Sequence, residues 1–373
     1  MIRSALALTA LTVSTGVAQA GGIDRSGTPI DIIFEEGNYA TLSYGYADPS
    51  LTGVDQEGAN VRNIAAGFGL VGVALKLDIA ENVSLAFILD EPYGVDVEYG
   101  PESAVLGGTL ADAESYGITT LVRYQATDRI SVYGGPRFVR AKGQINLGGS
   151  AYVLNGYESN FASDTGTGYV IGAAYEIPDI AFRAALTYHS EIDLSFDTTE
   201  TFPASAASIP FPLPTGVPVP TGTTNTTLPQ SIKLAVQSGI ATDTLVFGSV
   251  RWVDHDVFMV IPPVFPENLA SLDSSITYEL GIGRRFSERF SARASVIYED
   301  VLADDLVSPL TPTSGFTALS IGGQYQLTEA LDISGGIRYT WLGDATAEVS
   351  DSVVGEFRNN DVVSFGLKLG VRF

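Results

Sequence analysis

DVVSFGLKLGVRF, residues 361–373, is the stretch that decides the fold class of this chain. Its apolar residues alternate strictly with small or charged ones; they are Val363, Phe365, Leu367, Leu369, Val371 and Phe373. A β-strand points successive side chains to opposite faces, so one face is continuously apolar and the other carries Lys368 and Arg372. A soluble sandwich would bury the apolar face, whereas a membrane barrel would turn it toward lipid and keep the cations inside. The stretch alone leaves both alternatives open.

The first twenty residues have the organisation of a secretory signal peptide. Arg3 precedes an apolar run over residues 5–17, and residues 18–20 form an A-x-A cleavage site. We expect residues 1–20 to be the signal peptide and the mature chain to begin at Gly21. No later segment has the roughly 20 apolar residues that a membrane-spanning helix needs. Any insertion into a membrane must therefore take the form of a barrel.

The composition favours an exported, acidic, all-β protein. The 373 residues include 40 Gly, 17 Tyr, 18 Phe and no Cys, so no disulfide contributes to stability. The 43 acidic and 20 basic residues give a formal net charge of −23, which argues against nucleic acid and other anionic partners. No linker or break in composition divides residues 39–373, and we expect them to form one unit.

Fourteen segments have the pattern of strands, and their connections alternate between tight and long. The strands are predicted at 39–48, 68–79, 82–99, 114–125, 130–141, 167–177, 180–193, 229–239, 243–254, 274–285, 288–299, 315–327, 330–342 and 362–373. Tight turns are predicted at 126–129, 178–179, 286–287 and 328–329, and long loops at 49–67, 100–113, 142–166, 194–228, 255–273, 300–314 and 343–361. Bacterial outer-membrane barrels have an even strand number with short turns at one end and long loops at the other. The terminal Phe373 resembles their assembly signal, and the barrel is favoured over a soluble sandwich.

Cations within the predicted strands lie opposite the bulky apolar residues. They are Arg123, Arg183, Arg293, Arg338, Lys368 and Arg372. Most acidic residues fall in loops, although Glu279, Glu299 and Asp332 lie within strands. Two interpretations remain open. The arginines either form a salt-bridge lattice that holds the barrel in shape, or some of them bind a substrate carboxylate, for which the guanidinium group is suited.

The predicted strand at 82–99 is interrupted. Alternation from Val83 to Phe87 meets Glu91-Pro92-Tyr93-Gly94 and resumes from Val95 to Tyr99. Proline donates no hydrogen bond to the ladder and glycine permits a sharp bend, so this segment predicts a break in the wall. The alternative is an ordinary strand end followed by a short hairpin.

Four motifs point to one family. Pro92-Tyr93-Gly94 followed by Tyr99 resembles a P-[FY]-G-x(4)-Y signature, and Tyr188-His189-Ser190-Glu191-Ile192 resembles a Y-R-S-x-[IV] strand end. Leu228-Pro229-Gln230-Ser231 resembles an L-P-x-S motif, and Trp252 stands where the same family has a Trp. In this order and spacing the chain resembles the FadL/TodX family, outer-membrane channels for long-chain fatty acids and other hydrophobic compounds.

This resemblance implies a fourteen-stranded barrel whose lumen is blocked by a small N-terminal plug, here residues 21–38. It also implies lateral release of the compound through the kinked third strand, with Pro92, Tyr93 and Gly94 as the lateral gate. Leaving through the wall preserves apolar burial, which contributes about 0.8 kcal/mol per CH₂. Two features depart from the family pattern: the short plug segment lacks an Asn-Pro-Ala motif, and His189 stands in place of an Arg.

Two predicted outer loops are rich in apolar residues. The first, at 196–229, carries seven prolines and no Lys or Arg, and the second reads VFMVIPPVF at 257–265. Exposed patches of this kind mark interaction surfaces, so the loops either capture substrate or fold over the mouth as a lid. We expect Phe211 and Phe265 to hold the apolar tail of a substrate. Its carboxylate is expected to meet one of the cations Arg183, Arg293 and Arg338.

Catalytic and metal-dependent functions have little support in the sequence. His189 and Ser190 are adjacent in a predicted strand and face opposite sides, so they cannot act as base and nucleophile. Asp254-His255-Asp256 is typical of a solvated strand end. With no Cys and two His, we expect no metal site, no cofactor and no enzymatic activity.

The leading hypothesis is a passive uptake channel for long-chain fatty acids or similar hydrophobic compounds. We expect it in the bacterial outer membrane, as a monomer surrounded by outer-membrane lipids and lipopolysaccharide. The alternative is a porin for polar solutes or a purely structural barrel, and an outer-membrane hydrolase is a third possibility.

Overall fold

The chain forms one closed antiparallel barrel in a computed structural model that describes residues 23–204, 215–265, 267–270, 272–303 and 305–373. The predicted signal peptide and Phe211 lie outside the described residues. The first barrel strand, β1 (Tyr39–Ser50), pairs with both β4 (Phe68–Ala80) and the last strand, β22 (Asp361–Arg372), which closes the ring. Seventeen strands make up this sheet, and three wall strands are each interrupted once, so the described part of the wall has fourteen strands, as predicted.

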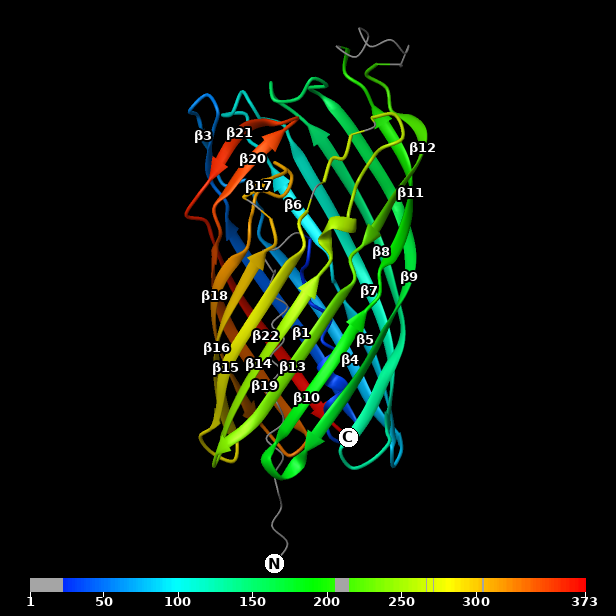
Figure 1. Ribbon diagram of the computed structural model, residues 1–373, viewed down its shortest axis with the longest axis vertical. Helices are drawn as coiled ribbons and strands as arrows, with labels where there is room; N and C mark the ends of the chain where they lie inside the picture. The colour runs from blue at the N-terminus through cyan, green and yellow to red at the C-terminus, as the bar shows by residue number, and fades with distance from the viewer. Residues whose placement is uncertain (1–22, 205–214, 266, 271, 304) are drawn as a thin grey trace, which may run out of the picture.

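The wall strands run tilted around the barrel axis, with short connections at one end and long loops at the other (Figure 1). Between β1 and β22 the order along the chain is β4, β5 (Val83–Asp90) with β6 (Gly94–Glu98), β7 (Leu110–Gln125), β8 (Ile130–Leu147), β9 (Tyr157–Ile177), β10 (Phe182–His189) with β11 (Ile192–Thr201), β12 (Val219–Leu228) with β13 (Ser231–Ala241), β14 (Thr244–Val253), β15 (Ser275–Arg285), β16 (Phe290–Val301), β18 (Phe316–Gln326) and β19 (Leu331–Leu342). The predicted alternation of tight and long connections is confirmed, and the short connections define the turn end of the barrel.

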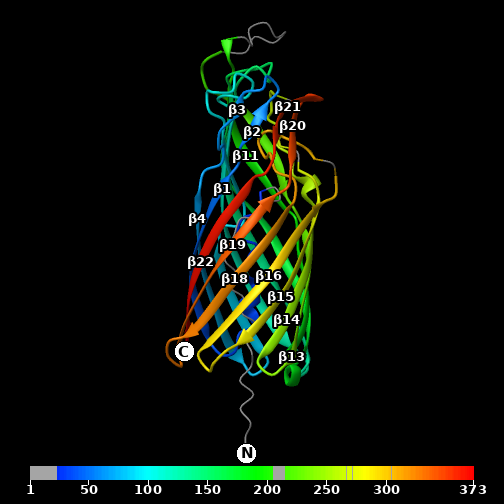
Figure 2. The same cartoon turned by 90° about the vertical axis from the view of Figure 1, so that its left-hand side faces the viewer.

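Several segments predicted as loops belong to strands. β8 and β9 extend through most of 142–166, and β11 and β12 take up the two ends of 194–228. Three further predicted loops form a separate five-stranded sheet over the loop end, made of β2 (Gly53–Asp55), β3 (Asn60–Val61), β17 (Leu306–Val307), β20 (Ala345–Val349) and β21 (Ser352–Phe357) (Figure 2). The boundaries were missed because these segments are rich in Thr, Ser, Asp and Asn, which obscures the alternation.

Toward the turn end, the wall is apolar outside and polar inside. Leu280, Ile321 and Ile337 have 66%, 67% and 63% of their surface exposed, whereas Asp332 and Ser364 point inward and are fully buried. This inverted arrangement matches a lipid-facing surface and confirms the membrane-barrel interpretation of residues 361–373. None of the described helices is long and apolar enough to cross a membrane.

Toward the loop end, the arrangement reverses. On β9, Tyr169 is 49% exposed on the outside, yet Tyr157 and Phe161, an even number of residues away, are buried inside. The reversal occurs at a β-bulge, where residues 162 and 163 of β9 lie opposite Lys142 of β8 alone. An extra residue shifts the alternation by one and moves the following side chains to the other face.

The interruptions in two other wall strands have the same effect. Leu186 of β10 is exposed outside and Ile192 of β11 is buried, and in the next wall strand Leu228 is buried while Ile232 is exposed. The rings of Tyr169 and Tyr188 lie 5.9 Å apart near this level. Outward aromatic rings are typical of the membrane interface, so beyond it the barrel has a polar exterior and an apolar interior.

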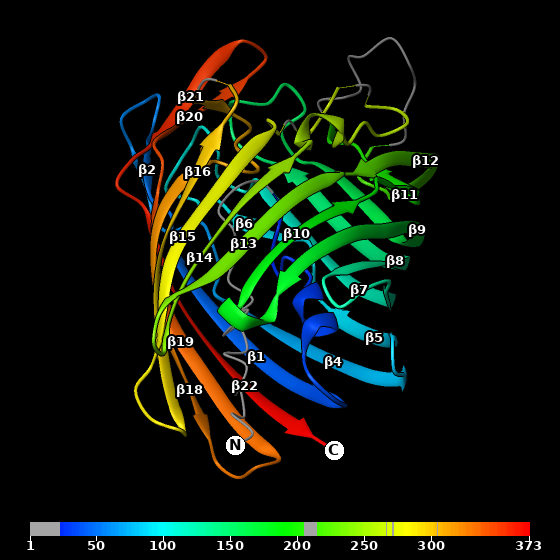
Figure 3. The same cartoon turned by 60° about the horizontal axis from the view of Figure 1, so that its bottom comes forward.

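The N-terminal segment, residues 23–38, lies inside the barrel (Figure 3, dark blue). Its short helix η1 (Ile30–Phe34) buries Ile33 completely, in a cluster with apolar side chains of the inner wall. The guanidinium group of Arg183 lies 4.3 Å from the centre of the Phe34 ring, and Glu35 forms an ion pair of 3.2 Å with Arg372. We propose that this segment is the plug of the lumen.

A plug formed by residues 23–38 should limit ion conduction through the barrel. Deletion of residues 23–35 should produce a large steady current in planar bilayers, because η1 and its ion pair would no longer occupy the bore. The full-length mature protein should show little current under the same conditions. Equal currents from the two proteins would contradict the plug and favour an open porin.

Candidate functional site

The predicted break in the third wall strand is a β-bulge. Asp90 of β5 pairs with Gly117 of β7, and Gly94 of β6 pairs with Glu114, so residues 91–93 lie opposite only two residues of β7. β5 pairs with β4 and β7, but β6 pairs with β7 alone within the barrel sheet. The hairpin alternative is therefore wrong. The ladder between the second and third wall strands stops at the kink, and β4 is left without a strand partner on that side over residues 68–72.

The kink is tied to its neighbours by hydrogen bonds. The Tyr93 N–H donates to Ser115 Oγ at 2.9 Å, and that hydroxyl donates to the Tyr93 carbonyl at 2.8 Å. Inside the barrel, the Gly94 N–H donates to the Ile23 carbonyl at 2.9 Å and the Arg25 N–H donates to the Pro92 carbonyl at 2.8 Å. The start of the N-terminal segment thus satisfies backbone groups that the bulge takes out of the ladder.

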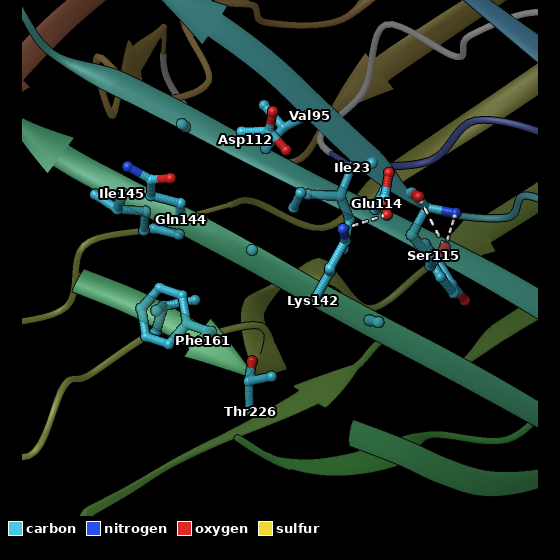
Figure 4. A pocket seen from close by; sticks show the side chains of 18 of the residues that line it. Ile23, Val95, Asp112, Glu114, Ser115, Lys142, Gln144, Ile145, Phe161 and Thr226 are labelled. Carbon is cyan, nitrogen blue, oxygen red and sulfur yellow. Dashed lines mark hydrogen bonds and ion pairs between the residues drawn. The ribbon is translucent and has the colours of Figure 1, made fainter. Parts of the chain in front are cut away.

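An apolar chamber of about 100 Å³ lies inside the barrel against this kink (Figure 4). Side chains that line it include Ile23, Tyr93, Val95, Phe161, Leu194, Phe196, Leu228, Phe258, Val260 and Leu310. Glu114 and Lys142 also border it, but they are 41% and 59% exposed and form an ion pair of 2.8 Å with each other. The chamber is therefore suited to an uncharged, apolar ligand.

The second predicted capture loop forms the roof of the chamber. Phe258 and Val260 line it, and Phe265 packs against Tyr157 with ring centres 4.9 Å apart. The buried carboxylate of Glu200 holds this loop, because it accepts hydrogen bonds from the backbone N–H groups of Val264 and Phe265 and from the Tyr157 hydroxyl. These contacts are those expected of a lid, while Met259 and Ile261 on the same loop are exposed.

A charged layer lies beneath the chamber. Asp24 pairs with Arg251 at 2.6 Å, and His255 Nε2 lies 3.9 Å from the same carboxylate. Burial raises the pKa of Asp24, but the positive charges of Arg251 and its neighbours outweigh it and hold the pKa below its usual value. Burial lowers the pKa of His255, although Asp24 acts against this effect. Arg137, also buried, donates to the Tyr93 hydroxyl at 3.3 Å, and so connects this layer to the chamber floor.

The three arginines predicted to meet a carboxylate lie on the inner face of the barrel but do not line the chamber. Arg183 faces a polar cavity of about 1050 Å³ at the turn end. Arg293 lies 5.7 Å from the centre of the Phe247 ring, and Arg338 is half-buried with Glu279 as its main electrostatic partner. A role in carboxylate binding stays a prediction for all three.

Ion pairs of other inner cations agree with the lattice interpretation. Arg123 pairs with Glu176, and Arg372 pairs with Asp332 at 2.9 Å as well as with Glu35. No cluster of metal-ligating side chains occurs among the described residues. The ring nitrogens of His189 have no hydrogen-bond partner there, and the hydroxyl of the adjacent Ser190 bonds backbone groups, so the two form no catalytic pair.

Most of the chamber lining was not predicted from the sequence. Phe161 and Leu194 fell in predicted loops or at a strand end, and Ile23 was assigned only to the plug. The signal that could have located Phe161 is the change of phase along β9, where aromatic residues at 157, 161, 169 and 175 share one parity but cannot all face lipid.

We expect the Glu200→Gln variant to loosen the roof. The neutral amide accepts hydrogen bonds more weakly than a carboxylate, so the cost of opening should fall by about 1–2 kcal/mol. Hydrogen exchange of the Val264 and Phe265 amides should accelerate about tenfold or more, a change that corresponds to 1.4 kcal/mol. The matched control, Glu158→Gln on the exposed side of β9, should leave these amides unchanged; equal exchange rates in all three proteins would contradict the role of Glu200.

Comparison with known proteins shows where this architecture occurs. Residues 36–372 match the sequence profile of the family described as outer membrane protein transport protein (OMPP1/FadL/TodX). No curated protein matches the chain by sequence.

Similar solved structures include a Pseudomonas aeruginosa FadL homologue, with 14% identity, 93% of each chain covered and a TM-score of 0.75. The P. putida toluene transporter TodX has 13% identity, 93% of this chain and 92% of that chain covered, and a TM-score of 0.69. The Ralstonia pickettii toluene transporter TbuX has 13% identity, 96% of each chain covered and a TM-score of 0.65. At these identities the similarity establishes the fold. Together with the profile match, it shows that this chain belongs to the OMPP1/FadL/TodX family of bacterial outer-membrane proteins, which are transport channels for hydrophobic compounds and not enzymes.

Proposed function

We propose that this channel takes up small uncharged hydrophobic compounds, holds them in the apolar chamber and releases them sideways through the kinked wall strand. The observation that carries the proposal is the contact between the two features, because Tyr93, Gly94 and Val95 of the kink also line the chamber. No energy source is required, since the compound moves down its concentration gradient. We further propose that the channel acts as a monomer among lipids and lipopolysaccharide.

The size and lining of the chamber support a small cargo. An apolar cavity of about 150 Å³ binds benzene, and the chamber here measures about 100 Å³. A compound of about one aromatic ring would fit after small movements of Ile23 or Phe258. Transfer of its surface out of water contributes about 25 cal/mol per Å², with no charge to desolvate. The toluene transporters among the similar structures carry cargo of this class.

The charged groups below the chamber support lateral release. A compound that continued along the barrel axis would pass the charges of Asp24, Arg137 and Arg251 and then the ion pairs around Glu35. These charged groups do not stabilise the apolar surface of the compound. The kink offers a shorter path, since the ladder between β4 and β6 is already interrupted there and the exposed apolar face of β4 and β5 begins beside it, at Val71, Val73 and Leu89.

A long-chain fatty acid is the second candidate cargo, and one observation favours it. Arg137 is buried just beneath Tyr93, and its Nε has no hydrogen-bond partner among the described residues. A fatty acid that entered the chamber carboxylate first would bring this group to the Arg137 nitrogen after the Tyr93 side chain moved. The chain of such an acid would require the chamber to extend into the roof.

Deletion of Pro92 tests lateral release. The bulge contains one residue more than the opposing strand, so this deletion should restore both the register with β7 and the alternation between β5 and β6. We expect uptake of radiolabelled toluene to be lost in cells that have no other channel of this kind. Purified protein should still bind toluene, because the rest of the chamber is unchanged.

The control is Pro92→Ala, which keeps the length of the bulge and should retain most of the uptake. Heat-modifiable migration on gels would establish that both variants form barrels. Normal uptake by the deletion variant would reject the lateral route.

Variants of Arg137 distinguish between the two candidate cargoes. If fatty acids are carried, Arg137→Gln should weaken oleate binding about tenfold or more, because it removes a charge-assisted hydrogen bond worth about 1.5–3 kcal/mol. Arg137→Lys should restore part of this loss. Toluene binding should change little in either variant. Tight oleate binding by the native protein with no toluene binding would contradict the preference for uncharged compounds.

A further inference from the structure

The direction of the Arg25 side chain carries an inference that rests on the lateral release proposed above. Residues 23–25 run extended along the inner side of the kink, where Asp24 pairs with Tyr93 as an isolated antiparallel bridge. Neighbouring side chains in an extended segment point to opposite sides. Asp24 reaches across the lumen to Arg251 on β14. Arg25 must therefore point the other way, into the wall.

The position of Gly94 shows how far the side chain extends. On β6, Val95 and Val97 pack into the interior clusters, so a Cβ atom at residue 94 would point outward. Such a Cβ would lie 2.5 Å from both Cζ and Nε of Arg25. The guanidinium group thus occupies the outer side of β6, although the Arg25 backbone is bonded to the kink from within the barrel.

The guanidinium group lies between the interior cluster and the outer face of the wall. Its Cζ lies 4.2 Å from the centre of the Phe68 ring, which packs against the interior cluster at the start of the part of β4 that has no strand partner toward β6. Its main electrostatic partners are the carboxylates of Asp96, Glu91, Asp112 and Glu114. Asp96 pairs with Asp112 across β6 and β7, and Gly94 pairs with Glu114, so these positions share the outward side of the sheet.

We propose that Arg25 is the gate residue of the lateral opening: its side chain passes outward between β4 and β6, closes the interruption in the wall, and has to withdraw before a hydrophobic compound can leave. The aliphatic part of the side chain fills the gap, while the charge reaches the acidic outer rim. The cation–π contact with Phe68 and the four carboxylates hold the gate closed. The plug and the wall opening are coupled, because the gate residue is part of the plug segment.

A charge measurement tests the position of the guanidinium group without any transport assay. The chain has no cysteine, so a single thiol is an unambiguous probe. In the Asp96→Cys variant, a guanidinium group on the outer face should lower the pH at which the thiol reaches half its maximal rate of labelling by a membrane-impermeant reagent. Adding Arg25→Gln should raise that pH. The matched control, Asp193→Cys on the outer side of β11, should show the same midpoint with and without Arg25. An unchanged midpoint for Asp96→Cys would place the guanidinium group elsewhere and overturn the inference.

A transport measurement tests the gate itself. Arg25→Ala should raise the rate of toluene uptake several-fold, because the opening is no longer filled. Gly94→Ala should do the same while Arg25 is retained, since the added methyl group takes the place of the guanidinium group. The control is Arg140→Ala, which removes an exposed arginine that donates to Ser163 on β8 and β9 and should leave uptake unchanged.

The outcomes separate the two proposals. Unchanged uptake in both Arg25→Ala and Gly94→Ala, with uptake lost on deletion of Pro92, would overturn the gate and leave lateral release standing. Normal uptake after deletion of Pro92 would overturn lateral release and the gate with it.

Discussion

A closed sheet shows alternate side chains of every strand to its two sides, and this constraint organises the whole protein. Toward the turn end the outside is lipid, so the exposed residues are apolar and the inside is polar. Toward the loop end the outside is water, and the same alternation would place apolar residues there. A strand that crosses both levels has to change face. It does so by the extra residue in β9, by the breaks between β10 and β11 and between β12 and β13, and by the kink at residues 91–93.

The chamber and the kink therefore have one physical origin. The change of face turns Phe161, Leu194 and Phe196 inward and so creates an apolar interior above the membrane. The same change in the third wall strand costs backbone hydrogen bonds with β4. The N-terminal segment compensates for part of this loss, because Ile23 and Arg25 bond the freed groups of Gly94 and Pro92. The kink thus lies against the apolar chamber because each strand has to face two environments.

The sequence predicts best where alternation reports one uniform environment. Residues 361–373 cross only the lipid level, and their inverted pattern is confirmed. Prediction failed above that level, because inward positions there include Thr198, Thr224 and Thr226 and outward positions include Asp and Asn, so the pattern has little apolar contrast. The face of Arg183, Arg293 and Arg338 was predictable from periodicity. Their distance from the chamber was not, since the chamber is built by residues from many strands. The position of the Arg25 side chain depends on the pairing of residues 23–25 with the kink. No local sequence pattern predicts this pairing.

The central claim is that a hydrophobic compound occupies the apolar chamber beside the kink. The most direct measurement is a crystal structure of the protein soaked with iodobenzene, in which the anomalous signal of iodine locates the ligand. We expect an iodine peak enclosed by Ile23, Tyr93, Phe161 and Phe196. Peaks confined to the polar bore below Asp24, or to the turn-end cavity around Arg183, with an empty chamber would contradict it.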